Sequence, residues 1–333
     1  MTENVTVREA LRKAIFMEME ANPDLFLMGE NMHYGGSLFS KVISSEFHQT
    51  FGKDRVIDTP VSENGIAGAA LGIALAGMKV IAEIYSADFL YAVGNEILND
   101  IPKWRYQHRY KAPLNLVVRA PMGVHRAGGG GPEHSQCPEA FLHNSPGLTI
   151  VAPATPADAV GLLRSALRSG DPVLFLEHRQ VYDIRGDVDF DSWFTVPLDR
   201  AEVVCEGSDL TVVAWGLMRW RAYEAIQELR KEGIRAALID PRTIKPLDME
   251  PVLKSAAETR RLMIVEEAPL TGSIASEIIA RTAEQTEGVR FKRLTMPDIP
   301  YPYHPALEAK VIPSVRDIAE AAKAFVGAKV SQA

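Results

Sequence analysis

The chain has little cysteine and no long apolar run, and each shortage excludes a class of protein. Its two cysteines, Cys137 and Cys205, are too few for a disulfide framework or a cysteine zinc site, so we expect a reducing compartment. No uninterrupted apolar stretch reaches the roughly 18 residues that a membrane-spanning helix needs. A structured segment begins near the N-terminus and leaves no room for a signal or transit peptide. We therefore expect a bacterial cytoplasmic protein, or else an already processed chain of the mitochondrial matrix.

Positive charge is also in short supply. The chain has 36 lysines and arginines against 43 acidic residues, a net charge of −7, and the basic residues form no cluster. This balance argues against a protein that binds nucleic acid. The apolar fraction of 47% and the charged fraction of 24% are those of an ordinary globular protein, and 333 residues suffice for two α/β domains.

Short apolar runs alternate with helical patterns in the first half of the chain. Thr6 followed by Glu9 predicts a capping box, and Thr155 before Pro156 predicts a second capped helix start. Helices are also expected at 40–51, 63–76 and 89–109, and Pro102 is expected to kink the last of these. The runs that predict strands lie at 25–28, 56–57, 80–84, 116–118, 148–151 and 173–176. Such alternation favours a parallel sheet covered by helices.

The second half repeats the alternation on a smaller scale. We predict a first α/β domain at residues 1–182, a linker at 183–199 that has no clear period, and a second α/β domain at 200–333. Strands are expected at 211–214, 236–239 and 262–265, with helices between them and a final helix at 314–326.

Glu63 opens a helix that otherwise contains small, apolar residues. Small residues let another backbone or a flat ring approach closely. An acidic residue at a helix start is often only a favourable contact with the helix dipole. A carboxyl group driven into an apolar wall also suits proton transfer, so both interpretations stay open from these residues alone.

His134 follows the glycine run Gly128 to Gly131. An isolated histidine is more often a packed or surface residue than a catalyst. This one lies beside a stretch too rich in glycine for a core element, where an imidazole can exchange protons with a substrate. Glu63 and His134 together indicate a buried proton-relay site.

Four motifs in register resemble one family. They are DTPVSENG at 58–65, AEI at 82–84, EHSQ at 133–136 and EEAP at 266–269. The chain is similar, from about Val5 to about Phe325, to the β subunit of the thiamine-diphosphate-dependent decarboxylating component of 2-oxo acid dehydrogenase complexes. The resemblance implies a pyrimidine-type, parallel-sheet domain followed by a smaller α/β domain like the C-terminal domain of transketolase.

The resemblance also implies roles for particular residues. Glu63 would hydrogen-bond N1′ of the aminopyrimidine and favour the imino tautomer, which can take the proton of thiazolium C2. Phe89 would pack on that ring, Tyr85 would border it and Val61 would contact it. His134 would donate or accept a proton during reductive acylation of the lipoyl group.

Cations and subunits follow from the same resemblance. A potassium ion is expected near Leu116, Ala166, Leu167, Ser169 and Asp171, held mostly by main-chain oxygens. The chain lacks the Gly-Asp-Gly motif that anchors magnesium and the diphosphate. An α subunit is therefore expected to supply that half of the site, in a heterotetramer of two α and two β subunits. The acyl group would pass to the lipoyl acyltransferase core of the complex.

Several alternatives stay open. The 2-oxo acid can be pyruvate or a branched-chain acid, and a closely similar β subunit serves in acetoin cleavage. A sugar-phosphate ketol transferase split into two chains would need basic residues for the phosphate, and only His125 and Arg126 suggest themselves. A catalytically silent assembly subunit is a further alternative. Glu63, His134 and Phe89 argue against it.

Overall fold

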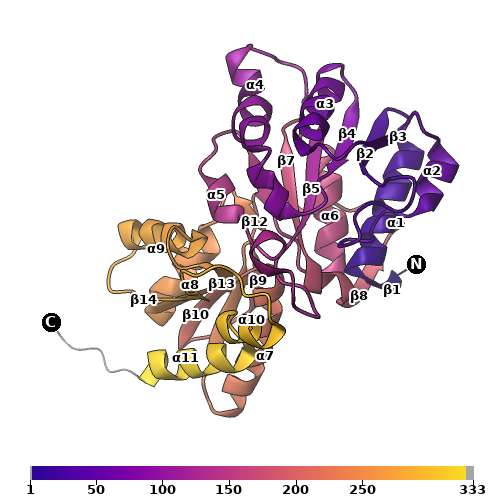
Figure 1. Cartoon of the computed structure of the whole chain (residues 1–333). Helices are drawn as coiled ribbons and strands as arrows, with labels where there is room; N and C mark the ends of the chain where they lie inside the picture. Colours follow the sequence, from indigo (N-terminus) through magenta and orange to yellow (C-terminus); the bar gives the residue numbers. More distant parts are fainter. Residues whose placement is uncertain (1, 328–333) are drawn as a thin grey trace. The chain divides into compact units, whose positions relative to one another are not determined.

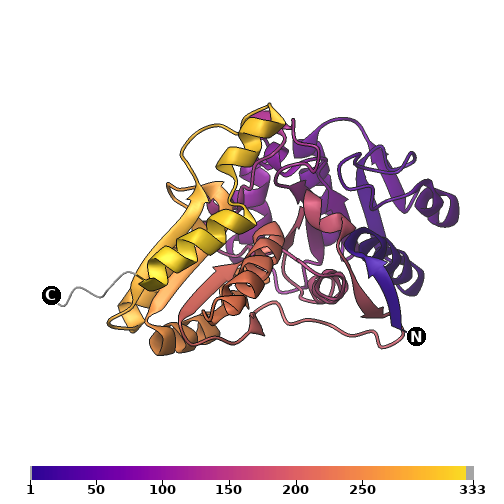
Figure 2. The same cartoon turned by 90° about the horizontal axis from the view of Figure 1, so that it is seen from below.

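The computed structural model describes residues 2–327, which fold into two compact units (Figures 1 and 2). The first unit comprises the described residues within 1–126, 133–198 and 244–246. The second comprises those within 127–132, 199–243 and 247–333. The glycine-rich stretch before His134 therefore belongs to the second unit, whereas His134 itself belongs to the first.

Helix α1 (Val7–Ala21) begins with the capping box that the sequence predicts. The Thr6 hydroxyl accepts a hydrogen bond from the Glu9 amide at 3.2 Å, and the Thr6 amide donates to the Glu9 carboxylate at 2.8 Å. These bonds satisfy amides that a helix start would otherwise leave free. The apolar face of α1 is buried, and it packs against α6 (Pro156–Ala166). Helix α6 starts at the predicted cap, where Thr155 accepts from Asp158.

A seven-stranded sheet forms the centre of the first unit, with the order β12-β6-β7-β5-β4-β2-β3. Five of its neighbouring pairs, from β6 to β3, are parallel. This confirms the expected α/β class, because near-continuous apolar strands suit a parallel sheet. The strands are β2 (Leu25–Glu30), β3 (Val56–Thr59), β4 (Lys79–Glu83), β5 (Leu116–Met122), β6 (Thr149–Val151), β7 (Val173–His178) and β12 (Thr243–Lys245).

The helix expected at 89–109 is divided in the structure. A 3-10 turn, η1 (Ala87–Tyr91), is followed by a π-helical turn, η2 (Glu96–Asp100), and by α4 (Ile101–Gln107). Pro102 lies in the first turn of α4, where its missing amide costs no hydrogen bond. Proline therefore starts an α-helix here, and the widened turn precedes it.

Other elements of the first unit are shorter than expected or were not predicted. Helix α2 (Ser45–Phe51) begins five residues later than the predicted 40–51. Strand β8 (Arg185–Asp189) pairs antiparallel with β1 (Thr2–Thr6), inside the stretch expected to be a linker. The remaining helices of this unit are α3 (Glu63–Leu75), α5 (Glu139–His143) and the 3-10 turn η4 (Arg179–Asp183).

The second unit contains a five-stranded sheet with the order β14-β13-β10-β11-β9. Its pairs are parallel except that β9 runs antiparallel to β11. The strands are β9 (Glu202–Cys205), β10 (Leu210–Ala214), β11 (Ala236–Asp240), β13 (Arg261–Pro269) and β14 (Arg290–Met296). The helices are α7 (Gly216–Lys231), α8 (Glu250–Thr259), α9 (Ile274–Gln285), α10 (Pro305–Val311) and α11 (Val315–Gly327), and α11 packs against α7.

Within residues 2–327, no helix combines the length and the apolar character that a membrane crossing requires.

Candidate active site

The candidate site lies at the carboxyl ends of four neighbouring strands of the first unit. Glu30 and Glu83 end β2 and β4, and His125 and Arg179 follow shortly after β5 and β7. Parallel strands deliver their carboxyl ends to one edge of a sheet, and ligands of open α/β sheets bind at that edge.

Glu63 is the first residue of α3 and is half-buried. The Ser62 hydroxyl caps this helix by accepting from the Gly65 amide at 3.3 Å. The neighbouring Asn64 side chain donates to the carbonyl of Ala92 at 2.9 Å and to the carboxylate of Glu96 at 3.0 Å. The start of α3 is therefore fastened to the segment that follows Phe89.

The small residues of α3 leave one face of that helix uncovered. Gly68 and Gly72 are exposed, and a Cβ atom added to either would meet nothing within 4 Å. Val61, just before the helix, is 79% exposed. Packing within the described chain therefore does not require glycine at these two positions. The uncovered face of α3 leaves room for a ring or for another chain.

Two of the predicted site residues, Tyr85 and His134, contact a ring that was not predicted, Phe39, and a third, Phe89, contacts His134. Phe89 meets His134 edge to face with ring centroids 5.5 Å apart. Phe39 lies 5.7 Å from the His134 ring and 5.3 Å from the Tyr85 ring. Tyr85, Phe89 and His134 are thus brought together, although 49 positions separate the first from the last.

Phe39 also contacts two further side chains that were not predicted to take part in catalysis. The His125 ring lies 4.9 Å from Phe39, and the Arg179 guanidinium lies over the Phe39 ring at 4.8 Å. Burial and the charge of Arg179 lower the pKa of His125 below its ordinary value. The cluster therefore contains three aromatic rings, two imidazoles and a buried cation.

His134 follows a glycine loop whose backbone needs glycine. Gly128, Gly129 and Gly131 have φ angles of 68°, 87° and 64°, which residues with a Cβ atom rarely adopt. Within the second unit, Gly128 packs against Pro305 and Gly131 against the ring of Tyr303. After the loop, the Gln136 amide donates to Asp88 of η1 at 3.0 Å. This hydrogen bond holds the segment after His134 beside η1, within the first unit.

A buried ion network lies beneath the cluster. Arg119 donates to Glu177 at 2.8 and 2.5 Å and also contacts Glu83, and all three side chains are 1% exposed. Burial lowers the pKa of Arg119, but Glu177 and Glu83 outweigh this effect, so the pKa is raised and the side chain stays cationic. Tyr182 donates to Glu177 at 2.6 Å and completes the network.

The network also holds the loop that carries Phe39. The Ser37 amide donates to Glu83 at 2.7 Å, and the Ser37 hydroxyl donates to the Tyr85 carbonyl at 2.9 Å. Ser40 donates to the other Glu83 oxygen at 3.3 Å. Because Glu83 is fixed by Arg119, Phe39 is positioned by a chain of hydrogen bonds that leads back to the centre of the sheet.

Glu30 is a second carboxylate at this edge that the sequence analysis did not assign. It is buried, and one of its oxygens has no hydrogen-bond partner among the described residues. Burial raises its pKa, and the charges of Glu63 and Glu83 raise it further. Glu63 is therefore close enough to Glu30 for the two carboxyl groups to repel each other. No local pattern in the sequence marks Glu30, because the carboxylates that act on it lie far away along the chain.

The residues expected near a potassium ion lie on the turn between α6 and β7, except for Leu116 at the start of β5. The Ser169 hydroxyl lies 3.0 Å from the Ala166 carbonyl and 2.8 Å from the Asp171 carbonyl. One hydroxyl hydrogen can satisfy only one of these oxygens. The Leu114 amide donates to Gly170, which brings the start of β5 beside the turn. Arg105 contacts Gly170 and Asp171 and already supplies a positive charge there.

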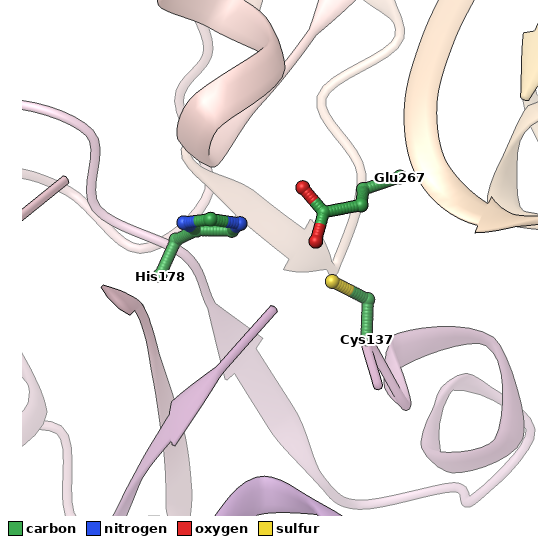
Figure 3. Close-up of side chains that lie close together, drawn as sticks. All are labelled: Cys137, His178 and Glu267. Atoms are coloured by element: carbon green, nitrogen blue, oxygen red, sulfur yellow. The ribbon is translucent and has the colours of Figure 1, made fainter. Parts of the chain in front are cut away.

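Cys137 and Cys205 form no disulfide within the part of the chain that the structure describes. Figure 3 shows the side chains of Cys137 and His178, whose sulfur and a ring nitrogen lie within 4.8 Å of each other. His178 Nδ1 accepts from the Gln180 amide at 3.1 Å, so its other nitrogen carries the proton when the ring is neutral.

Comparisons with known proteins agree on one family. Residues 3–184 match the family described as transketolase, pyrimidine binding domain, and residues 199–318 match the transketolase C-terminal domain. The 2-oxoisovalerate dehydrogenase subunit beta of Bacillus subtilis (strain 168) is 40% identical, over 94% of this chain and 98% of its own length. The pyruvate dehydrogenase E1 component subunit beta of Gracilaria tenuistipitata var. liui is 38% identical, over 98% and 100%.

Two further relatives widen the comparison. The acetoin:2,6-dichlorophenolindophenol oxidoreductase subunit beta of Cupriavidus necator is 37% identical, over 97% of this chain and 98% of its own length. Among solved structures, a split gene transketolase described as an inactive beta4 tetramer has a TM-score of 0.80 at 24% identity, covering 97% of this chain and 98% of its own. At that identity, the likeness shows the fold alone.

Proposed function

This chain belongs to the transketolase-like family of thiamine-diphosphate-dependent 2-oxo acid dehydrogenase β subunits, and we propose that it decarboxylates a 2-oxo acid together with an α subunit. The acyl group would pass to a lipoyl group on the acyltransferase core. One observation carries the assignment of the site: Phe89 and His134 form a ring pair, and Asn64 fastens the helix of Glu63 to the segment after Phe89.

The residues at the sheet edge fit thiamine diphosphate in kind. When bound, this cofactor supplies a carbon nucleophile for the 2-oxo group. Glu63 would hydrogen-bond the aminopyrimidine, Phe89 and Tyr85 would pack against that ring, and Val61 would touch it. The fit is supported by the exposure of Val61 and by the open, small-residue face of α3.

His134 would handle a proton during acyl transfer. Its ring is half-buried and packs edge to face against Phe89 and Phe39, which leaves the imidazole within reach of a substrate.

An α subunit would cover the exposed apolar residues around this edge. Tyr34, Val61 and Leu38 are 86%, 79% and 69% exposed and belong to the loops that flank the site. The chain has no Gly-Asp-Gly motif, so magnesium and the diphosphate would be held by the α subunit, in a heterotetramer of two α and two β subunits. The cytoplasmic location stays a prediction.

If this chain holds only the aminopyrimidine half of the cofactor site, cofactor binding should require the α subunit. Calorimetry with magnesium and thiamine diphosphate should detect firm binding to the mixture of α and β subunits and none to the β subunit alone. Firm binding to the isolated chain would contradict the proposal that the α subunit supplies half of the cofactor site.

The turn between α6 and β7 would hold potassium through the carbonyls of Ala166, Leu167 and Asp171, with Ser169 and Leu116 nearby. The support is the surplus of oxygen atoms around the Ser169 hydroxyl. Replacing sodium by potassium should raise the thermal unfolding midpoint of the wild type. It should raise that of Ser169→Ala less. Equal midpoints in both salts would contradict the site.

The substrate is tested directly on the reconstituted α and β pair. Pyruvate, 2-oxoisovalerate and acetoin would be offered with a dye as electron acceptor, and kcat/KM compared. Acetoin is the second candidate because a 37% identical relative is named for it. Turnover of a 2-oxo acid that disappears in Glu63→Gln supports the proposal, and a pair that turns over none of the three contradicts it.

A further inference from the structure

His125 makes a hydrogen bond to the backbone of the other histidine in the cluster. Its Nε2 lies 3.0 Å from the carbonyl oxygen of His134. A carbonyl oxygen can only accept, so the hydrogen must be on Nε2, and the neutral ring keeps its lone pair on Nδ1. The hydrogen bond thus joins the two sides of the glycine loop, nine positions apart in sequence.

The segment that carries His125 is anchored by two residues of η4 within the first unit. Arg179 donates to the Gly123 carbonyl at 2.6 Å, and the Gln180 side chain donates to the carbonyls of Val124 and His125 at 3.4 and 3.3 Å. The His125 ring itself packs on Phe39. His125 is therefore held in place by side chains of η4, whereas His134 follows four successive glycines, whose backbones have more intrinsic conformational freedom than those of other residues.

The charge state of His125 suits this task. Burial is the largest cause that lowers the pKa of His125, followed by the nearby cation of Arg179, and both effects favour the neutral ring. The charged or titratable groups that act on it are Arg179, His134 and Asp88. A neutral donor can hold the His134 carbonyl without placing a second positive charge beside an imidazole that has to gain and lose a proton.

We infer that His125 is a positioning residue: through its Nε2–H it fixes the His134 backbone so that the His134 ring stays between Phe89 and Phe39. This inference rests on the proposed function, in which His134 serves acyl transfer. It predicts that losing the donor impairs lipoyl acylation more than decarboxylation, because the ring is displaced while Glu63 is untouched.

Two substitutions separate the donor from the bulk of the side chain. His125→Gln keeps an amide N–H at about the place of Nε2, whereas His125→Asn places it one bond short. In the reconstituted complex, kcat for acylation of a free lipoyl domain should fall about tenfold in His125→Asn, the scale of one lost hydrogen bond. Dye-linked decarboxylation should fall less than about threefold, and His125→Gln should recover most of the acylation rate.

A second readout does not depend on activity. Diethyl pyrocarbonate modifies accessible imidazoles, and the rate at His134 can be followed by peptide mass spectrometry. A released loop should make His134 react several-fold faster in His125→Asn than in the wild type or in His125→Gln. Equal rates in all three proteins, or a Gln variant no better than Asn in acylation, would overturn the inference.

Different results would contradict the proposed function and the positioning role of His125. If the wild-type complex turned over no 2-oxo acid, the proposed function would fall, yet the modification rates would still test whether His125 holds His134. If the complex were active and both half-reactions dropped equally in His125→Asn, only the positioning role would fall.

Discussion

The ring of Phe89 meets the imidazole of His134 edge to face, with centroids 5.5 Å apart and planes inclined by 83°. The two residues come from different elements, η1 and the segment after the glycine loop, which are joined by the hydrogen bond from Gln136 to Asp88. An aromatic pair of this geometry contributes about 0.5–1.5 kcal/mol beyond simple burial. It therefore links a residue expected to bind the cofactor ring with a residue expected to move a proton.

Glu63→Gln should abolish turnover and leave the fold intact. Glutamine keeps the shape of the side chain but cannot hold an acidic proton for the aminopyrimidine. We expect kcat of the reconstituted complex to fall by about 100-fold or more, the scale of a lost acid–base group. The lost contact with the helix dipole should cost at most about 1 kcal/mol. Dye-linked activity and thermal unfolding measure the two effects.

Glu250→Gln is a matched control, because Glu250 is also the first residue of its helix, α8. Its side chain is 81% exposed, and its salt bridge to Arg200 is on the surface. The control should show a small stability change and wild-type activity. Equal activity in Glu63→Gln and Glu250→Gln would refute the role of Glu63.

His134→Ala should slow acylation of a lipoyl domain by about 100-fold and dye-linked decarboxylation by less than about tenfold. The reason is that the imidazole is assigned to the second half-reaction only. His108→Ala is the control, since His108 is an exposed residue that stacks on Trp104 of α4. An equal loss in both half-reactions would give His134 a broader role than the one proposed.

Local signals in the sequence predicted much of the fold. The Thr6 and Thr155 caps and the apolar runs depend on neighbouring residues, and both caps are confirmed. Strands β1 and β8 were missed because TENVT and RGDVD contain no apolar run to mark them. The division of residues 89–109 into three turns depends on Pro102 and on packing, which a helical pattern does not reveal.

The site divides in the same way. Tyr85, Phe89 and His134 were found through motifs, and the structure brings them together. Phe39 and Glu30 carry no local mark. Phe39 gains its place from Ser37, which bonds to Glu83 across 46 positions, and Glu30 is notable only because Glu63 and Glu83 lie nearby. Long-range contacts of this kind are not visible in a single sequence.

Gly131→Ala should destabilise the glycine loop more than Gly129→Ala. Both glycines have positive φ angles, 64° and 87°, so both alanines incur a backbone cost of about 1–2 kcal/mol. A Cβ at Gly131 would lie 2.2 Å from Cε1 of Tyr303, whereas one at Gly129 meets nothing closer than 3.8 Å. Moving the ring should cost about 1 kcal/mol more, the low end of the range for overpacking, because Tyr303 is 62% exposed.

Thermal unfolding of the two variants measures this difference, and lipoyl acylation measures its effect on His134, three positions later. We expect a lower midpoint and slower acylation in Gly131→Ala. Identical midpoints for the two alanine variants would show that Tyr303 does not confine the loop.

Glu30→Gln should change how stability depends on pH. Burial, and then the charges of Glu63 and Glu83, raise the pKa of Glu30 above its ordinary value of 4.5. Between the unfolded and the folded pKa, the folded protein binds more protons at this group than the unfolded chain. Stability therefore falls as pH rises through that window. Glutamine stays neutral at every pH. The thermal midpoint of Glu30→Gln, relative to that of the wild type, should therefore increase as pH rises above 4.5.

Glu9→Gln provides a comparison of opposite sign. The hydrogen bonds from the Thr6 amide and hydroxyl lower the pKa of Glu9, so its contribution is present above the unfolded pKa and is lost as pH falls through the folded pKa. The thermal midpoint of Glu9→Gln, relative to the wild type, should therefore decrease as pH rises from below 4. The relative midpoint of Glu30→Gln should instead increase above pH 4.5. Thermal melts of the three proteins at intervals from pH 3 to pH 8 give both trends. A Glu30 variant whose midpoint matched the wild type at every pH would mean that neither burial nor the nearby carboxylates raise the pKa of Glu30.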